Sequence, residues 1–412
     1  MDLSRDLLVE ILVRLPAQAL VRLMTVCKSW KSIITSSEFC SLHLSRNRHT
    51  SKILLITRDR GQCNGDNDNV PKEWYLLLNN DEHLPADPSW LVPFDFPCFQ
   101  CQDLTSQHIL GSINGLICIS LIPYYLWGDV EANIPIVLWN PTIRRYIRLP
   151  NPTFSYTCNS SIEFGYDATT DDYKVMVIRR VGGSTTTTTP ALEFHIYSLN
   201  SHAWRGGFKI CPPAGTGERG DRRLFGSTGA LAGGKMHWIV SNEINYDEVE
   251  LDEMELLCKR SLYSFDVAEE VFAEMALPEE ELAHDKVSTD PIITVVRDSL
   301  HLVQGTLGLP MYWTIWVKMD AGGSCDMYWK KLYRVDVTAI FVCFLKNGEY
   351  LMDKYPPHPS TGVVDDDHGV LAAYDPRARQ FKDLEPLSLS QQRAFGSVRS
   401  FNHQESLVLL DR

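Results

Sequence analysis

Several groups of reactive residues in this sequence have spacings close to those of known chemical motifs. Gly229, Gly234 and Lys235 have the spacing of a loop that wraps phosphate groups. Such a loop needs Ser or Thr after the lysine to bind Mg²⁺, and the N-terminus of a helix behind it. Met236 follows instead, and the next residues have the pattern of a strand. The sequence therefore argues against a nucleotide site here.

The candidate metal ligands are also incomplete. Cys98 and Cys101 form a single C-x-x-C pair, whereas a structural zinc site needs a second pair of ligands. The acidic run 365–367 beside His368 is more typical of a charged loop between strands. The sequence contains no HExxH and no G-x-S-x-G pattern. We therefore predict a chain without catalytic residues, metal site or cofactor.

The charge of the chain is acidic but unevenly distributed. The 412 residues include 39 Lys and Arg and 52 Asp and Glu, for a net charge of -13. Residues 1–50 contain seven basic and four acidic side chains, a net charge of +3, which leaves -16 for the remainder. An acidic protein binds nucleic acid phosphates and anionic membranes poorly, so we predict neither as a partner. A basic head on an acidic body indicates two units with different partners.

The cysteines and the N-terminus indicate the cellular compartment. Eleven cysteines are spread along the chain without a framework spacing, and charged residues interrupt the first 14 positions. Free thiols and the absence of an apolar signal segment predict a protein of the cytosol or nucleus. Residues 104–128 carry no charge but contain several polar residues, glycines and a proline. They predict loop and strand rather than a membrane span.

The first 46 residues predict three short helices. Leu8, Ile11, Leu12 and Leu15 follow the i, i+3, i+4, i+7 spacing of one helical face. Pro16 ends this helix and opens a second over 17–27, and a third follows over 28–34. A unit of this size is too small to bury all its apolar side chains. Some of them should therefore contact a partner.

These residues resemble a known family. The pattern Leu-x-x-Asp-Leu-Leu-x-Glu-Ile-Leu-x-Arg-Leu-Pro over 3–16, followed by Val-Cys-Lys-x-Trp over 26–30, is similar to an F-box, although Ser4 stands where the family usually has proline. The resemblance implies docking onto the Skp-type adaptor of a cullin–RING ubiquitin ligase. We expect the adaptor to contact Leu3, Leu7, Leu8, Ile11, Leu15, Pro16 and Leu20. We expect Val26, Cys27 and Trp30 to form the internal core of the head.

The body has a strand-like pattern with a repeated pair of aromatic residues. In each copy a strand ends in an aromatic residue, a turn follows, and a second aromatic residue lies seven positions on: Trp139 and Tyr146, Tyr197 and Trp204, Phe265 and Phe272, Tyr374 and Phe381. Asn140, Asp266 and Asp375 follow the first aromatic residue, where Asx side chains favour tight turns. A degenerate copy lies at 315–317 and 328–329. The spacing of 58 and 68 residues between the first three copies is typical of a kelch-like β-propeller.

The ends of the body predict how the ring closes. Residues 52–56 and 74–78 are apolar strands, and pairing them with residues 406–410 would complete a sixth blade without exposed edges. We predict six blades, with five or seven as alternatives and a β-sandwich as the other possible fold. The fold class is thus a multidomain α+β chain, with a three-helix head at 1–46, a linker at 47–51 and an all-β propeller at 52–412.

The body also resembles a family. Gly-Ser-x-Asn-Gly-Leu-Ile-Cys (111–118), Leu-Trp-Asn-Pro-Thr-x-Arg-Arg-Tyr (138–146), Phe-Gly-Tyr-Asp-x-x-x-Asp-Asp-Tyr-Lys-Val (164–175) and Met-His-Trp (236–238) are similar to the F-box-associated domain of a large plant family. Both resemblances imply a non-catalytic receptor that brings a target protein to a ubiquitin ligase. The alternative is a propeller enzyme or lectin with a small-molecule pocket and an incidental head.

The target-binding surface is the least determined part of the sequence. Tyr124, Tyr125, Trp127 and Trp313 are candidates, because aromatic residues are frequent at interface hot spots. Packing inside a blade is the alternative role for each. The acidic body favours a basic target over a phosphorylated one.

Overall fold

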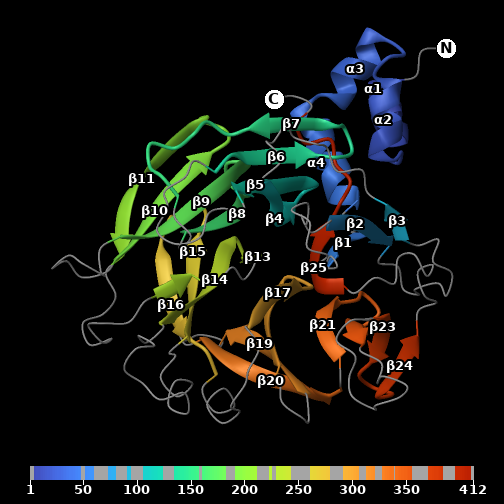
Figure 1. The fold of residues 1–412 in the computed structure, drawn as a ribbon. Coiled ribbons are helices and arrows are strands. Elements are labelled where there is room, and N and C mark those ends of the chain that lie inside the picture. Colours follow the sequence, from blue (N-terminus) through green and yellow to red (C-terminus); the bar gives the residue numbers. More distant parts are fainter. Residues whose placement is uncertain are drawn as a thin grey trace, which may run out of the picture.

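The computed structural model describes the head and most of the body. The described residues are 4–47, 52–59, 73–79, 91–93, 105–123, 134–156, 160–181, 191–210, 222–224, 229–242, 260–278, 291–305, 312–320, 327–337, 339–354, 370–383 and 395–409. Four short helices precede a ring of β-sheets (Figure 1). Within these residues no helix is both long and apolar enough to cross a membrane.

The head consists of α1 (Arg5–Leu12), α2 (Ala17–Leu23), α3 (Lys28–Ile34) and α4 (Ser37–Arg46). The Ser4 hydroxyl caps α1 by accepting a hydrogen bond from the backbone N–H of Leu7, at 3.4 Å. The fourth helix was not predicted. It begins because the hydroxyl of Ser36 accepts a hydrogen bond from the N–H of Phe39, at 3.3 Å, directly after α3 ends.

The body is a six-bladed propeller, as predicted (Figure 1). Blade 1 contains β25 (Phe395–His403), β1 (Lys52–Asp59), β2 (Glu73–Asn79) and β3 (Leu91–Pro93). Blade 2 contains β4 (Thr105–Ile113), β5 (Leu116–Pro123), β6 (Ile136–Asn140) and β7 (Arg145–Arg148), and blade 3 contains β8 (Ser160–Asp167), β9 (Asp172–Val181), β10 (Ala191–Ser198) and β11 (Ala203–Ile210).

The remaining blades follow the same antiparallel order. Blade 4 contains β12 (Arg222–Leu224), β13 (Ala230–Ala232), β14 (Lys235–Asn242), β15 (Arg260–Asp266) and β16 (Phe272–Ala276). Blade 5 contains β17 (Ile292–Val296), β18 (Ser299–Gly305), β19 (Tyr312–Asp320) and β20 (Met327–Asp336). Blade 6 contains β21 (Ala339–Phe344), β22 (Tyr350–Lys354), β23 (Val370–Asp375) and β24 (Gln380–Asp383).

The aromatic repeat marks the hairpin between the two outer strands of a blade. In all four predicted copies the two aromatic residues are direct cross-strand partners. The side chains of Asn140, Asp266 and Asp375 each accept a backbone N–H two residues on, at 2.8 to 3.1 Å. The fifth residue after the first aromatic has a positive φ in every copy: Arg144, His202, Glu270 and Arg379. The spacing of seven therefore encodes one turn geometry.

The ring closes differently from the prediction. β25 supplies the closing strand and pairs antiparallel with β1, with Lys52 opposite His403. The described part of the predicted strand 406–410 is not a strand. Leu407 and Leu409 are instead buried in a core shared with blade 2. The Asn140 amide donates to the backbone carbonyls of Ser406 and Val408, at 3.1 and 2.8 Å, and so holds this tail in place.

The tail contact predicts a specific cost for one substitution. Replacing Asn140 by Ala removes the donor to one buried and one partly buried carbonyl group, and it removes the turn bond to Thr142. We expect a loss of about 1–3 kcal/mol in the free energy of unfolding, measured by urea denaturation. Asp375→Ala is the matched control, because that side chain accepts bonds within its own turn only. An equal loss in both variants would contradict the role given to the tail.

Candidate functional site

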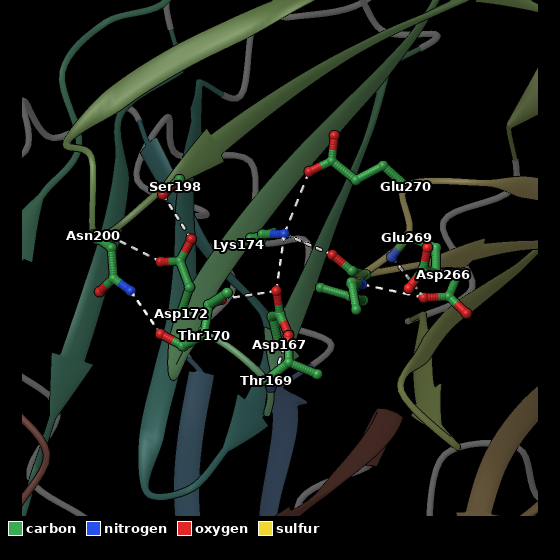
Figure 2. Close-up of polar contacts among 12 residues, drawn as sticks. Asp167, Thr169, Thr170, Asp172, Lys174, Ser198, Asn200, Asp266, Glu269 and Glu270 are labelled. Carbon is green, nitrogen blue, oxygen red and sulfur yellow. Dashed lines mark hydrogen bonds and ion pairs between the residues drawn. The ribbon is translucent and has the colours of Figure 1, made fainter.

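The most concentrated polar cluster lies between blades 3 and 4 (Figure 2). The buried Lys174 ammonium donates to the Val267 carbonyl at 2.6 Å and lies 3.3 Å from carboxylate oxygens of Asp167 and Glu270. Glu270 in turn pairs with Arg205. Lys174 is thus placed where β9 meets the turn after β15, and it ties two blades together.

The carboxylates of this cluster are satisfied by neighbouring groups. Burial alone would raise the pKa of Asp167, but hydrogen bonds from Thr169, Thr170 and Lys174 outweigh it and hold that pKa well below its usual value. Asp172 accepts from the Ser198 hydroxyl at 2.6 Å and from the backbone N–H of Asn200 at 2.9 Å. Because so many donors hold the pKa of Asp167 low, its carboxylate suits structural anchoring rather than proton transfer.

A second buried acid lies on β8, at the border with blade 4. Glu163 is almost fully buried, and one of its oxygens accepts from the Ser161 hydroxyl at 2.7 Å. Burial raises the pKa of Glu163 to about 8, against the opposing effect of the Ser161 hydrogen bond. Gly229, at the start of blade 4, lies so close that any side chain there would overlap the Glu163 carboxyl group.

Glu163 predicts a pH-dependent contribution to stability. The folded chain retains this proton up to about pH 8, whereas the ordinary pKa of the side chain is 4.5. The contribution is therefore present below pH 4.5 and is lost as the pH rises towards 8. We expect Glu163→Gln to gain stability relative to the wild type from pH 5 to 8, measured as urea midpoints. The exposed Glu274 gives the control Glu274→Gln, and a pH-independent difference for Glu163→Gln would contradict the assignment.

The head carries the second candidate site, an exposed apolar surface. The described residues include ten exposed large apolar side chains, and four of them lie in the head, which makes up about a sixth of the described residues: Leu7, Ile11, Val26 and Leu42. These four are between 45% and 59% exposed. Leu7 and Ile11 are one turn apart on α1, so they form a continuous ridge. We call these four residues the head surface.

The structure corrects parts of the predicted adaptor contact. Leu8 and Leu20 are buried in the head's own core, with Leu12, Ile34 and Phe39, so they are not accessible to a partner. Leu7, Ile11 and Pro16 are exposed and Leu15 is half-buried. Leu3 lies outside the described residues. The helical spacing predicted an apolar helix correctly. It did not distinguish the buried face with Leu8 from the exposed ridge with Leu7 and Ile11.

The predicted core of the head is also partly wrong. Val26 and Cys27 are exposed because they form the link between α2 and α3 rather than a helical face. The Cys27 sulfur caps α3 by accepting from the N–H of Trp30, at 3.4 Å. Trp30 is half-buried and packs against the core as expected. Val26 therefore joins the head surface, a role that the sequence did not indicate.

The other sequence candidates are dispersed. Trp313 is buried, and its indole N–H donates to the Ala339 carbonyl at 2.7 Å, so it joins blades 5 and 6 rather than facing a target. Lys235 opens β14 after a turn at Gly233 and Gly234, which confirms strand rather than a phosphate loop. Residues 105–123 form β4 and β5, in agreement with strand rather than a membrane span. Tyr124, Tyr125, Trp127, Cys98, Cys101 and residues 365–368 lie outside the described residues.

Two family models match this chain, one over the helices and one over the ring. The model of the F-box domain matches residues 1–42, and that of the F-box associated beta propeller domain matches residues 121–374. The second match spans more than half of the chain. The chain therefore belongs to the family of F-box proteins with an F-box-associated propeller.

Individual relatives agree with this assignment. The chain is 24% identical to F-box protein At3g07870 of Arabidopsis thaliana over 93% of its own length and 87% of that protein. It is 24% identical to F-box/kelch-repeat protein At3g23880 of the same plant, over 64% of this chain and 68% of that one. Among solved structures, the β-propeller domain of the Trilobed protease from Pyrococcus furiosus is 13% identical, with a TM-score of 0.36 over 72% of this chain and 75% of that chain.

Proposed function

We propose that this protein is the substrate receptor of a Skp–cullin–F-box type ubiquitin ligase, acting in the cytosol or nucleus. The head surface docks the Skp-type adaptor, and the propeller holds a target protein. The observation that carries this function is the exposed ridge of Leu7 and Ile11 on a head whose own core is already filled. Exposed apolar side chains concentrated on so small a unit indicate a protein interface.

The joint between head and propeller supports the same function. The Gln404 side chain, just after β25, donates to the Leu44 carbonyl in α4 at 2.8 Å. Glu405 pairs with Lys52 at the start of β1, at 2.9 Å. His43 on α4 is buried and bonds to the Leu15 carbonyl at 3.0 Å, which connects α4 to the rest of the head. The Gln404 hydrogen bond thus attaches α4 to the closed ring next to the Lys52–Glu405 ion pair.

A contact between head and propeller suits a receptor that works by proximity. Holding the target at a constant distance from the ligase raises its effective concentration at the charged conjugating enzyme. Other subunits transfer the ubiquitin, so this function requires no nucleophile, acid or base in the receptor. The buried polar groups of blades 3 and 4 then serve to hold the ring together.

The adaptor contact can be tested by placing charge on the ridge. We expect the double variant Leu7→Asp and Ile11→Asp to fold, because both side chains are exposed, and to bind the adaptor at least about tenfold more weakly. Binding of the purified full chain to the adaptor would be measured by titration calorimetry. Phe208→Asp, which changes an exposed apolar residue of β11, is the matched control. Undiminished binding by the double variant would exclude the head surface as the docking site.

A further inference from the structure

Two residues just after β25 contact the chain on both sides of the junction between head and propeller. Residues 48–51, which we call the connecting segment, join the head to Lys52, the first residue of β1. The Gln404 amide donates to the Leu44 carbonyl at 2.8 Å, and the Glu405 carboxylate pairs with Lys52 at 2.9 Å. Adjacent residues of the tail therefore hold the chain before and after the same four-residue segment.

The charged groups at this junction converge on Glu405. Burial lowers the pKa of two nearby imidazoles, His43 on α4 and His403 at the end of β25, the latter to about 4. The Glu405 charge opposes this effect at both groups without outweighing it. Both imidazoles are therefore neutral at pH 7, and Lys52 provides the positive charge that pairs with Glu405.

The tail is fastened to the ring on both sides of these two residues. Before them, β25 pairs with β1. After them, the Asn140 amide donates to two backbone carbonyls of the tail, at 3.1 and 2.8 Å, and Arg145 donates to a third at 2.9 Å. Gly115 lies so close that any side chain there would overlap the Gln404 carbonyl and Ser406. The segment that carries the two residues is thus anchored to blades 1 and 2.

The contact at Leu44 reaches the rest of the head through α4, which lies beside the tail that follows β25 (Figure 1). His43, next to Leu44, is buried and bonds to the Leu15 carbonyl at 3.0 Å. Phe39, also on α4, lies in the buried core with Leu8 of α1. A contact that holds α4 therefore also holds α1, which carries the ridge of the head surface.

Apolar packing and polar contacts make different contributions to this junction. One cluster of buried apolar side chains includes the core of the head, Leu407 and Leu409 of the tail, and Leu116 and Leu138 of blade 2. Hydrophobic attraction is non-directional, so it holds the two units together over a range of angles. A hydrogen bond weakens steeply away from its preferred geometry, so the Gln404 bond favours one angle.

We propose that Gln404 and Glu405 form a clamp that sets the direction in which the head points from the propeller. Without the clamp, the ends of the connecting segment can take any separation up to about 13 Å, and each of its residues adds two soft dihedral angles. In the receptor proposed above, the clamp orients a bound target relative to the ligase, and this consequence rests on the proposed function. The clamp itself acts in the free chain.

The test measures the distance distribution between head and propeller in the free full chain. Spin labels on a ketone-bearing amino acid, placed at the exposed positions Lys28 on α3 and Glu274 on β16, avoid the native cysteines. Pulsed electron resonance should give one narrow distribution when residues 404 and 405 are unchanged. We expect the double variant Gln404→Ala and Glu405→Ala to widen it by at least about 5 Å, because the freed segment has a reach of about 13 Å.

Matched variants separate the clamp from a general loss of stability. Gln380→Ala with Glu269→Ala changes two exposed ring positions and should leave the distribution unchanged. Lys52→Glu should widen the distribution, and adding Glu405→Lys, which restores the ion pair with reversed charges, should narrow it again. If the double alanine variant does not fold, Gln404→Glu gives the same test, because it keeps the shape of the side chain and removes the N–H donor.

The clamp is overturned by an unchanged distribution in the alanine or Gln404→Glu variant, by equal widening in the control, or by a wild-type distribution that is already broad. A failure of Glu405→Lys to reverse the effect of Lys52→Glu overturns the part given to Glu405. Adaptor binding of the unlabelled variants, measured by titration calorimetry, should be unchanged, because no substitution lies in the head surface. Its absence in the wild type overturns the proposed function, whereas the distance distribution still decides the clamp.

Discussion

The structure depends on the pairing of β25 with β1, which joins the two ends of the propeller. A ring of sheets has exposed edges until its last strand pairs with its first, and closing so long a loop has an entropic cost that local contacts must offset. The tail after β25 provides such contacts, through the Asn140 amide and the burial of Leu407 and Leu409. Because Gln404 and Lys52 lie at the same junction, closure of the ring also positions the head.

Polar and apolar groups have separate roles in this arrangement. Lys174 is buried and bonds from blade 3 to blade 4, whereas Asp167 and Asp172 are buried and bonded to groups of blade 3. Exposed large apolar side chains lie on the head surface and also on outer strands of the propeller, among them β7, β11 and β20. Figure 1 places the helices and β20 on opposite borders of the molecule.

The sequence predicted those features that depend on local geometry. The aromatic pairs seven residues apart predicted the outer hairpins, because a fixed turn places the two rings opposite each other. Tyr166 and Tyr173 follow the same spacing, with Asp167 directly after the first aromatic residue and a positive φ at Asp171. They mark the hairpin between β8 and β9 in blade 3, which was not predicted. Features that depend on distant contacts were not predictable in this way. Among them are the burial of Leu8 and Leu20, the exposure of Val26 and the choice of β25 as the closing strand.

In the function proposed above, the outer ridge of α1, and not the propeller, contacts the adaptor. Amide hydrogen exchange of the full chain, followed by mass spectrometry with and without the adaptor, tests it most directly. We expect slower exchange in peptides covering Arg5–Leu12 and the link at Val26 when the adaptor is bound, with unchanged exchange in β20. Slower exchange confined to the propeller, with α1 unaffected, would contradict it.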